Sequence, residues 1–421
     1  MRRTTASGGN RGQALPAPVG VRFVATYALA VMSVALILIA PLLVTLALKI
    51  RSLVGADQAP ESLALVTGVG GLLALVAGPI FGRLSDRTSS RSGMRRPWLI
   101  GGLLGGVIGI TVVAVAPSLV VVLVGWCLAQ LFFNALQAAL VAVLPDQVPA
   151  TQRGTVSGVL GITVPVAAVL GTFLVQLFTG HMTAMFLAPC AIGAALVLLF
   201  VVLLDDRRLS EEDARPWSVS DVVTAFHLDP RRHPDFAWAL AGRFLFVCAF
   251  ALLTTYQAYY LLDRIGSAEA DVPAQVFRAT LVQSAVLVVA SLVGGRLSDR
   301  IGRRKVFVVT AAVTYGAALF VVAMADTFGG FLVGMAVSGL GFGAYMAVDV
   351  ALVADVLPDA ADSARDLAIF NMANALPFAL APAVAPVILA VSGDSYGVLY
   401  AVAGACALLA AAAVVPIRGV R

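Results

Sequence analysis

Twelve long apolar stretches restrict what this chain can fold into. Each has about 20 residues or more, the length that an α-helix needs to cross the hydrocarbon core of a bilayer. A soluble domain has about 25% charged residues, whereas only 12% of this 421-residue chain is charged. We therefore predict twelve transmembrane helices, at residues 23–48, 62–82, 98–116, 118–144, 154–179, 183–204, 236–262, 276–295, 306–325, 328–356, 367–391 and 396–416.

The lysines and arginines predict how these helices are oriented. With the N-terminus in the cytoplasm, the cytoplasmic segments carry 23 basic residues, and the outer loops carry only Lys49, Arg51, Arg264 and Arg278. An excess of basic residues marks the cytoplasmic side of membrane proteins. We expect a multi-pass protein of the cell membrane with both termini in the cytoplasm. The net charge of +5 follows this topology and does not indicate nucleic acid binding.

The chain also repeats itself at a fixed spacing. GRLSDR occurs at Gly82–Arg87 and Gly295–Arg300, and LPD occurs at Leu144–Asp146 and Leu357–Asp359, both 213 residues apart. Parallel repeats of this kind are a transporter architecture with a solute site between the halves. We expect an all-α integral membrane protein of two pseudo-symmetric six-helix bundles. Its segments are a tail of residues 1–22, a bundle of 23–204, a charged cytoplasmic linker of 205–235, a bundle of 236–416 and a tail of 417–421.

The repeated loops resemble the signature of the major facilitator superfamily. Its cytoplasmic loop has the form G-x-L-x-D-R-x-G-R-R, which the second copy, GRLSDRIGRRK, follows closely. The first copy, GRLSDRTSSRSGMRRPW, has a longer form that resembles the sugar–cation symporter branch, including sucrose-type carriers. In helix count and repeat the resemblance covers essentially the whole chain, and its motifs are specific for the superfamily. It implies alternating access and a conformational latch formed by Gly82, Asp86, Arg87, Arg95, Arg96, Gly295, Asp299, Arg300, Arg303 and Arg304.

The residues of this loop also have a physical explanation of their own. Gly82 and Gly295 let helices pack closely where they leave the membrane. The two motif aspartates lie beside helix ends, where a helix dipole or an arginine can hold them. The alternative is that the arginines only set the topology. In the third helix, Gly101, Gly105 and Gly109 recur every four residues and predict a close helix contact.

Polar and aromatic side chains fall on single faces of three helices that the resemblance places around the central cavity. Their spacing is that of one helix face. Amides and rings together suit a polar, ring-shaped solute such as a sugar, and they also suit an amphipathic drug. The alternative for the amides is hydrogen bonding between helices. The predicted solute-binding residues are Gln130, Asn134, Gln137, Phe246, Phe250, Tyr256, Gln257 and Tyr345.

Two charges deep in apolar stretches predict a coupling site. Arg243 lies eight residues beyond Asp235, and Asp349 lies eight residues before Leu357. At about 1.5 Å per residue, both are about 12 Å from the same membrane side. A lone charge there costs at least a few kcal/mol, so we expect an ion pair. Asp349 either binds the coupling proton or stays paired with Arg243 as a gate; the alternatives are a fixed structural pair and pairing through Asp355.

These features predict a secondary active transporter. Cation-coupled uptake of a sugar-like solute, with a proton as the cation, is favoured by the first loop. It is also favoured because residues 154–179 lack the G-P-x-x-G-G element that many drug antiporters carry. Against it, the first helix lacks the carboxylate of many proton-coupled sugar carriers. Proton-driven efflux of amphipathic drugs or metabolites is the alternative.

Other classes of protein are disfavoured by motifs that the sequence lacks. An enzyme would need an HExxH motif, a nucleophile elbow or paired carboxylates, and an ATP-driven pump would need a phosphate-binding loop. A channel would leave the repeated latch unexplained. The three histidines and four cysteines form no ligand pattern, so we expect no metal and no cofactor. The expected partners are the solute, a proton and the bilayer, with the protein acting as a monomer.

Overall fold

The computed structural model describes residues 18–206, 234–356 and 363–417, except for the side chains of Asp299, 350–356 and 363–371. Within those ranges the chain forms long helices joined by short loops. Four predicted features lie wholly or partly outside them. These are the N-terminal tail, the linker, the second LPD element and the C-terminal tail.

Six spans form the first half. Its opening span is bent through a π-helical segment: α1 (Val21–Ala40) continues through η1 (Pro41–Thr45) into α2 (Leu46–Val54). The other five are single helices. They are α3 (Ala59–Ser85), α4 (Arg96–Val115), α5 (Leu119–Gln147), α6 (Ala150–Leu177) and α7 (Met182–Leu203).

The second half repeats this plan. Its opening span also ends in a π-helical segment, with α9 (Pro234–Tyr259) followed by η3 (Tyr260–Arg264). Twelve helices of the described chain are long and apolar enough to cross a membrane, so the prediction of twelve is confirmed. The remaining five are α10 (Val272–Ile301), α11 (Arg304–Ala323), α12 (Phe328–Val356), α13 (Ser363–Ser392) and α14 (Tyr396–Val414).

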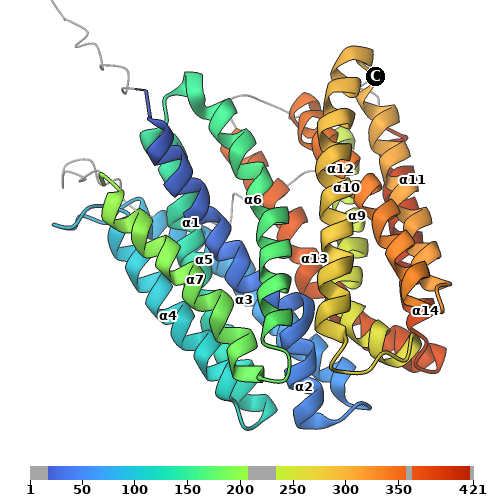
Figure 1. Cartoon of the computed structure of the whole chain (residues 1–421). Coiled ribbons are helices and arrows are strands. Elements are labelled where there is room, and N and C mark those ends of the chain that lie inside the picture. The colour runs from blue at the N-terminus through green and yellow to red at the C-terminus, as the bar shows by residue number, and fades with distance from the viewer. Residues whose placement is uncertain (1–17, 207–233, 357–362, 418–421) are drawn as a thin grey trace, which may run out of the picture.

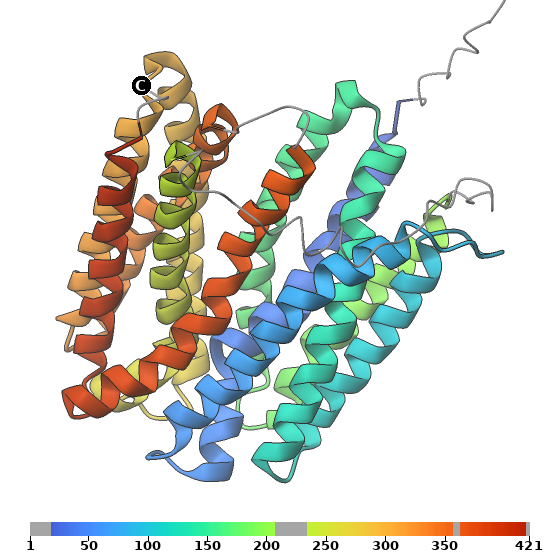
Figure 2. The same ribbon diagram turned by 180° about the vertical axis from the view of Figure 1, so that it is seen from behind.

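The two halves stand side by side and lean together at one end (Figures 1 and 2). Both ends of the described chain lie at the opposite end, where the helices of the two halves spread apart. We call these the closed end and the termini end. Because each span crosses the bundle once, the loops of the two GRLSDR copies lie at the termini end.

Several helices extend further than the apolar stretches. Lys49 and Arg51 lie on α2, Arg264 lies in η3 and Arg278 lies on α10, so the prediction that they belong to loops is wrong. A bilayer with its headgroups is about 40–45 Å thick, which needs about 27–30 helical residues. Hydropathy marks the hydrocarbon layer only, and the helices continue through the headgroup layer.

Close glycine contacts hold each half together. A Cβ on Gly109 of α4 would lie 2.4 Å from the backbone nitrogen of Ala129 in α5. A Cβ on Gly343 of α12 would lie 2.3 Å from the carbonyl oxygen of Leu287 in α10. The predicted contact of the third helix is therefore present. Gly101 takes no part in it, because a Cβ there would meet nothing within 4 Å.

Candidate functional site

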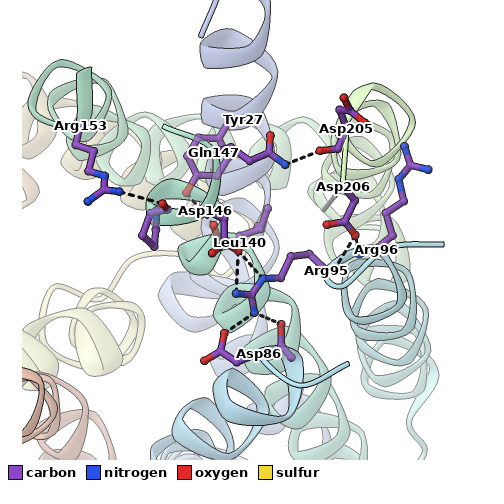
Figure 3. A network of polar contacts seen from close by, with 12 residues as sticks. Tyr27, Asp86, Arg95, Arg96, Leu140, Asp146, Gln147, Arg153, Asp205 and Asp206 are labelled. Carbon is purple, nitrogen blue, oxygen red and sulfur yellow. Dashed lines mark hydrogen bonds and ion pairs between the residues drawn. The ribbon is translucent and has the colours of Figure 1, made fainter. Parts of the chain in front are cut away.

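Arg95 is the centre of an ion-pair network at the termini end of the first half (Figure 3). The residue is only 3% exposed. Its Nη1 lies 2.7 Å from Asp86 Oδ1 and donates to Ser85 Oγ at 2.6 Å. Its Nη2 and Nε lie 2.8 and 2.9 Å from Asp146 Oδ2. One guanidinium thus ties the end of α3 and the LPD element of α5 to the start of α4.

Asp206 fixes the start of α4. Its Oδ2 accepts the backbone N–H groups of Arg95 and Arg96 at 2.8 and 2.7 Å. The first N–H groups of a helix lack partners within it, and an acid there is also favoured by the helix dipole. Gly93 makes room for this carboxylate, because a Cβ on it would lie 2.2 Å from Oδ2. The longer first loop therefore binds Asp206, which lies shortly after the end of α7.

The second copy is arranged differently. α10 ends at Gly302, whose left-handed backbone (φ 66°) lets its N–H donate to Ser298 O at 2.8 Å. Glycine adopts this conformation without steric cost. Lys305 Nζ donates to the carbonyls of Val415 and Ile417 at 2.5 and 2.8 Å. The Asp299 side chain lies outside the described residues, so a latch in the second half stays a prediction for Gly295, Asp299, Arg300, Arg303 and Arg304.

A cavity of about 240 Å³ lies between the two halves. Its wall comes from α1, η1, α3 and α5 on one side and from α13 on the other, and it is mostly apolar. Gln130 and Asn134 supply two amides, and Asn134 Nδ2 donates to the carbonyl of Gln130 at 2.7 Å. Gln137, from the same predicted stripe, is not a lining residue and lies about two turns beyond Gln130 towards the termini end.

Trp126 is a cavity residue that the sequence interpretation missed. It is 1% exposed and packs on Gly70, where a Cβ would lie 2.6 Å from its Nε1. No residue of the described chain accepts a hydrogen bond from this buried N–H. Buried indole N–H groups usually have a partner, whereas this one packs against Gly70. The signal was its position four residues before Gln130, on the amide stripe.

A series of five rings leads from the cavity wall into the second half. Phe378 lines the cavity, and Phe250 meets it edge-on at 6.1 Å between centroids. Phe342 lies 4.3 Å from Phe250 and 5.8 Å from Phe246. Phe246 stacks on Tyr345 at 3.6 Å. Phe246, Phe250 and Tyr345 therefore stand behind the cavity wall, and solute binding by them stays a prediction.

Tyr256 and Gln257 are buried in the packed interior and do not line the cavity. The hydroxyl of Tyr256 donates to Pro382 O at 2.9 Å, and the ring is fully buried. Gln257 is 1% exposed, and its Nε2 lies 3.4 Å from Thr254 O. Contact of these two residues with solute would need this packing to open, so it stays a prediction.

Arg243 and Asp349 form an ion pair inside the second half, between α9 and α12. Arg243 Nη1 donates to Asp349 Oδ2, and the two side chains are 5% and 3% exposed. The pair lies one turn from the Phe246–Tyr345 stack, at Arg243 and Phe246 on α9 and at Tyr345 and Asp349 on α12. The Asp355 side chain lies outside the described residues. A proton on Asp349 would remove the negative charge of the pair. A role of the pair in coupling stays a prediction.

Ionic and hydrogen-bond contacts join the halves at the closed end. Arg51 Nη1 of α2 lies 2.7 Å from Asp263 Oδ1 of η3. The hydroxyl of Tyr259 donates to Ala47 O at 3.0 Å. These contacts involve the two π-helical spans, so the opening helices of the two halves close the cavity on this side.

Comparison with known proteins gives a consistent pattern. The family model described as Major Facilitator Superfamily matches residues 23–281 and 273–420. The chain is 34% identical over 157 residues to Multidrug resistance protein MdtL of Escherichia coli. It is 34% identical over 151 residues to the MdtL of Klebsiella pneumoniae. Each match covers 35% of this chain, and the chain spans only 37% of the length of these relatives.

Solved structures resemble the whole fold. The nucleoside transporter NupG has a TM-score of 0.75 at 14% identity and covers 94% of this chain and 99% of its own. A POT family transporter in complex with a thioalcohol-conjugated peptide has a TM-score of 0.72 at 11% identity, covering 94% and 96%. A bacterial homolog of the human lysosomal transporter Spinster, in an inward-facing conformation, has a TM-score of 0.64 at 15% identity, covering 94% and 97%. At such identities the likeness concerns the fold alone.

Proposed function

Because the chain belongs to the Major Facilitator Superfamily and is a multi-pass membrane transporter, we propose that it exports small amphipathic solutes in exchange for protons. The observation that carries this proposal is the lining of the central cavity. Its wall is mostly aliphatic and aromatic and includes the ring of Trp126, and its polar side chains are two amides and one threonine. A site of this kind suits an apolar ring with a hydrogen-bond acceptor.

Two further observations support export. No acidic or basic side chain lines the cavity among the described residues, which favours a solute without a net charge. The relatives that match part of the chain are named multidrug resistance proteins. The Arg243–Asp349 pair supplies a group that a proton can neutralise, and it lies behind the cavity wall.

The proposed orientation gives the structure a place in the transport cycle. With both termini in the cytoplasm of the cell, as the basic residues predict, the termini end is the inner side and the structure is inward-facing. We propose that the bundles of 23–204 and 236–416 move as bodies about the cavity, joined by the linker of 205–235, within a monomer. A cysteine replacing Ser218 in the linker should then resist impermeant thiol reagents added to intact cells, and rapid labelling would reverse the orientation.

Uptake of a sugar-like solute with a cation is the second candidate. The form of the first loop favours it, because GRLSDRTSSRSGMRRPW resembles the sugar–cation symporter branch. The amides of Gln130 and Asn134 are also groups that bind hydroxyls. This candidate differs from export in both the solute and the direction of the proton gradient that drives transport.

Proteoliposomes with an imposed pH gradient separate the two candidates. We expect radiolabelled chloramphenicol, a neutral ring compound with acceptors, to accumulate when the lumen is acidic. Radiolabelled sucrose should not accumulate, whether the lumen or the exterior of the vesicles is acidic. Sucrose accumulation into vesicles with an acidic exterior would replace export by uptake, and failure of both probes to respond would contradict both candidates.

The cavity itself is tested by a pair of glycine variants on α3. Gly70→Ala adds a Cβ 2.6 Å from Trp126, whereas Gly78→Ala meets nothing within 4 Å. Overpacking costs about 1–3 kcal/mol, so we expect Gly70→Ala to lower chloramphenicol transport about tenfold or more. Gly78→Ala should transport normally. Equal transport by the two variants would remove Trp126 from the site.

A further inference from the structure

An apolar groove of about 650 Å³ runs along the outside of the protein where α6 and α10 meet. One wall belongs to each half of the protein. At the closed end, Phe173 of α6 and Phe277 of α10 meet at 5.5 Å between ring centroids. The groove continues from this ring pair towards the middle of the membrane. Its lining includes Ile162, Val166, Val169, Leu281, Ala285 and Val288.

The groove faces the lipid rather than the central cavity. Ile162, Val166 and Leu281 are 47%, 44% and 44% exposed, although they belong to helices that cross the membrane. Ser284 is the one lining residue with a polar side chain. A concave and apolar surface inside a bilayer is filled by hydrocarbon, because it offers water no hydrogen-bond partners.

Arg278 lies near the closed end of the protein, on the face of α10 that lines the groove. It is three and seven residues before Leu281 and Ala285, which is the spacing of one helix face, and it is exposed. It is six residues after the first residue of α10, or about 9 Å into a helix of about 45 Å. A bilayer with a hydrocarbon core of about 30 Å has its headgroup boundary at about this depth.

An exposed arginine at this boundary can bind an anionic lipid headgroup. Among the described residues none forms an ion pair with Arg278. The Cα–Cβ bond of a helical residue tilts towards the helix N-terminus, so this side chain extends towards the headgroups. Arginine binds phosphate oxygens through two N–H groups at once.

We propose that the groove holds an acyl chain of an anionic phospholipid whose headgroup binds Arg278. The inference is independent of the proposed function, because it concerns the groove between α6 and α10 and not the central cavity. Since the two walls belong to different halves, a bound chain bridges them in this conformation. Anionic lipid therefore favours the state in which α6 and α10 are in contact.

Photo-crosslinking in bilayers of defined composition tests the proposal. The full-length protein is reconstituted with a trace of phosphatidylglycerol or phosphatidylcholine that carries a diazirine in the acyl chain, and the labelled peptides are identified by mass spectrometry. We expect labelling on 162–173 and 277–288. One basic contact favours the anionic lipid about fivefold, so phosphatidylglycerol should label these peptides about fivefold more than phosphatidylcholine.

Three variants sharpen this experiment. Arg278→Gln should reduce phosphatidylglycerol labelling to the phosphatidylcholine level, and Ala285→Trp should abolish labelling by filling the groove. Arg296→Gln, the same change at the other end of α10, should leave it intact. Equal labelling by the two lipids in the wild type, or labelling that survives Ala285→Trp, would overturn the proposal. Transport is not measured, so failure of export leaves this test unaffected.

Discussion

Among the described residues, each half of the protein buries one arginine, and the surroundings of these two side chains differ. Arg95 is held by two carboxylates and a hydroxyl at the membrane edge, where the Asp86 side chain is 58% exposed. Arg243 is paired with Asp349 inside the second half, and both side chains are at most 5% exposed. Water can solvate the carboxylates of the first network, whereas the second pair depends on its own charge balance.

This difference assigns the two arginines different tasks. In the first network Arg95 keeps a second carboxylate and a hydroxyl when one partner is lost, so we expect this network to act as a structural clamp on α3, α4 and α5. We expect a dehydrated pair to respond strongly to one added proton, because protonation of Asp349 removes the negative charge of the pair. We therefore predict that the first half supplies a stable frame and that the second half supplies the group that responds to protons. The following predictions test this comparison, from the largest expected effect to the smallest.

Asp349→Asn should abolish accumulation of solute driven by a pH gradient while solute exchange continues. The amide cannot take up the proton, and it still fills the space beside Arg243. Counterflow and gradient-driven transport of labelled chloramphenicol in proteoliposomes measure the two activities. Asp326→Asn, at a carboxylate that is 73% exposed and pairs with Arg264, is the matched control. An Asp349→Asn protein that still concentrates its solute would show that the pair does not couple transport.

Arg243→Gln should lower the free energy of unfolding by about 3–5 kcal/mol, because it leaves a buried carboxylate without its partner. The double change Arg243→Leu and Asp349→Leu should restore most of that loss. Thermal unfolding in detergent, followed by size-exclusion chromatography, gives the comparison. Arg264→Gln, which breaks an exposed pair, should cost less than about 1 kcal/mol. A similar loss for both single variants would mean that burial does not distinguish the pairs.

Asp146→Asn should destabilise the first half more than Asp86→Asn does. Asp146 accepts two charged hydrogen bonds and is 23% exposed, which predicts a loss of about 1.5–3 kcal/mol. The more exposed Asp86 should contribute less than about 1 kcal/mol. Asp86→Asn should nevertheless reduce transport sharply with membrane insertion intact, as the latch hypothesis requires. Normal transport by this variant would leave only the structural task.

Arg51→Gln should cause the smallest effect, a shift in the balance of the two conformations of up to about fivefold. Its pair with Asp263 joins the halves at the closed end and is partly exposed, so its loss costs about 0.2–1 kcal/mol. Spin labels on Asp57→Cys and Glu269→Cys report the separation of the halves there. We expect a larger share of long distances. Arg264→Gln breaks a pair within one half and should leave the distribution unchanged.

The sequence predicted the helices because their length and apolar composition are set by the bilayer. Lipid requires spans of a set length, and the excess of basic residues records the crossings. Equal depth also predicted the pairing of Arg243 with Asp349. Helix ends were less accurate, as Lys49 and Arg51 show, because the headgroup layer imposes no apolar pattern.

The solute site was less predictable, because it depends on how helices are rotated and packed. Gln130 and Asn134 line the cavity, whereas Gln137 on the same stripe does not. Trp126 counts as an apolar residue in any composition, and only the fold brings its ring into the cavity wall and against Gly70. Asp206 could not be connected with Gly93 either, since 113 residues separate them and only the fold joins them.

The glycine contacts within each half also restrict how the gene can vary. Every missense change in a glycine codon adds at least a Cβ, and at Gly109 or Gly343 that atom would meet backbone that cannot rotate away. Selection should therefore remove almost all missense alleles at these codons. Gly101 and Gly78, with open space around them, are free to drift. The history of such a gene should show invariant glycines at the close contacts inside each half and variable residues where the space around the glycine is open.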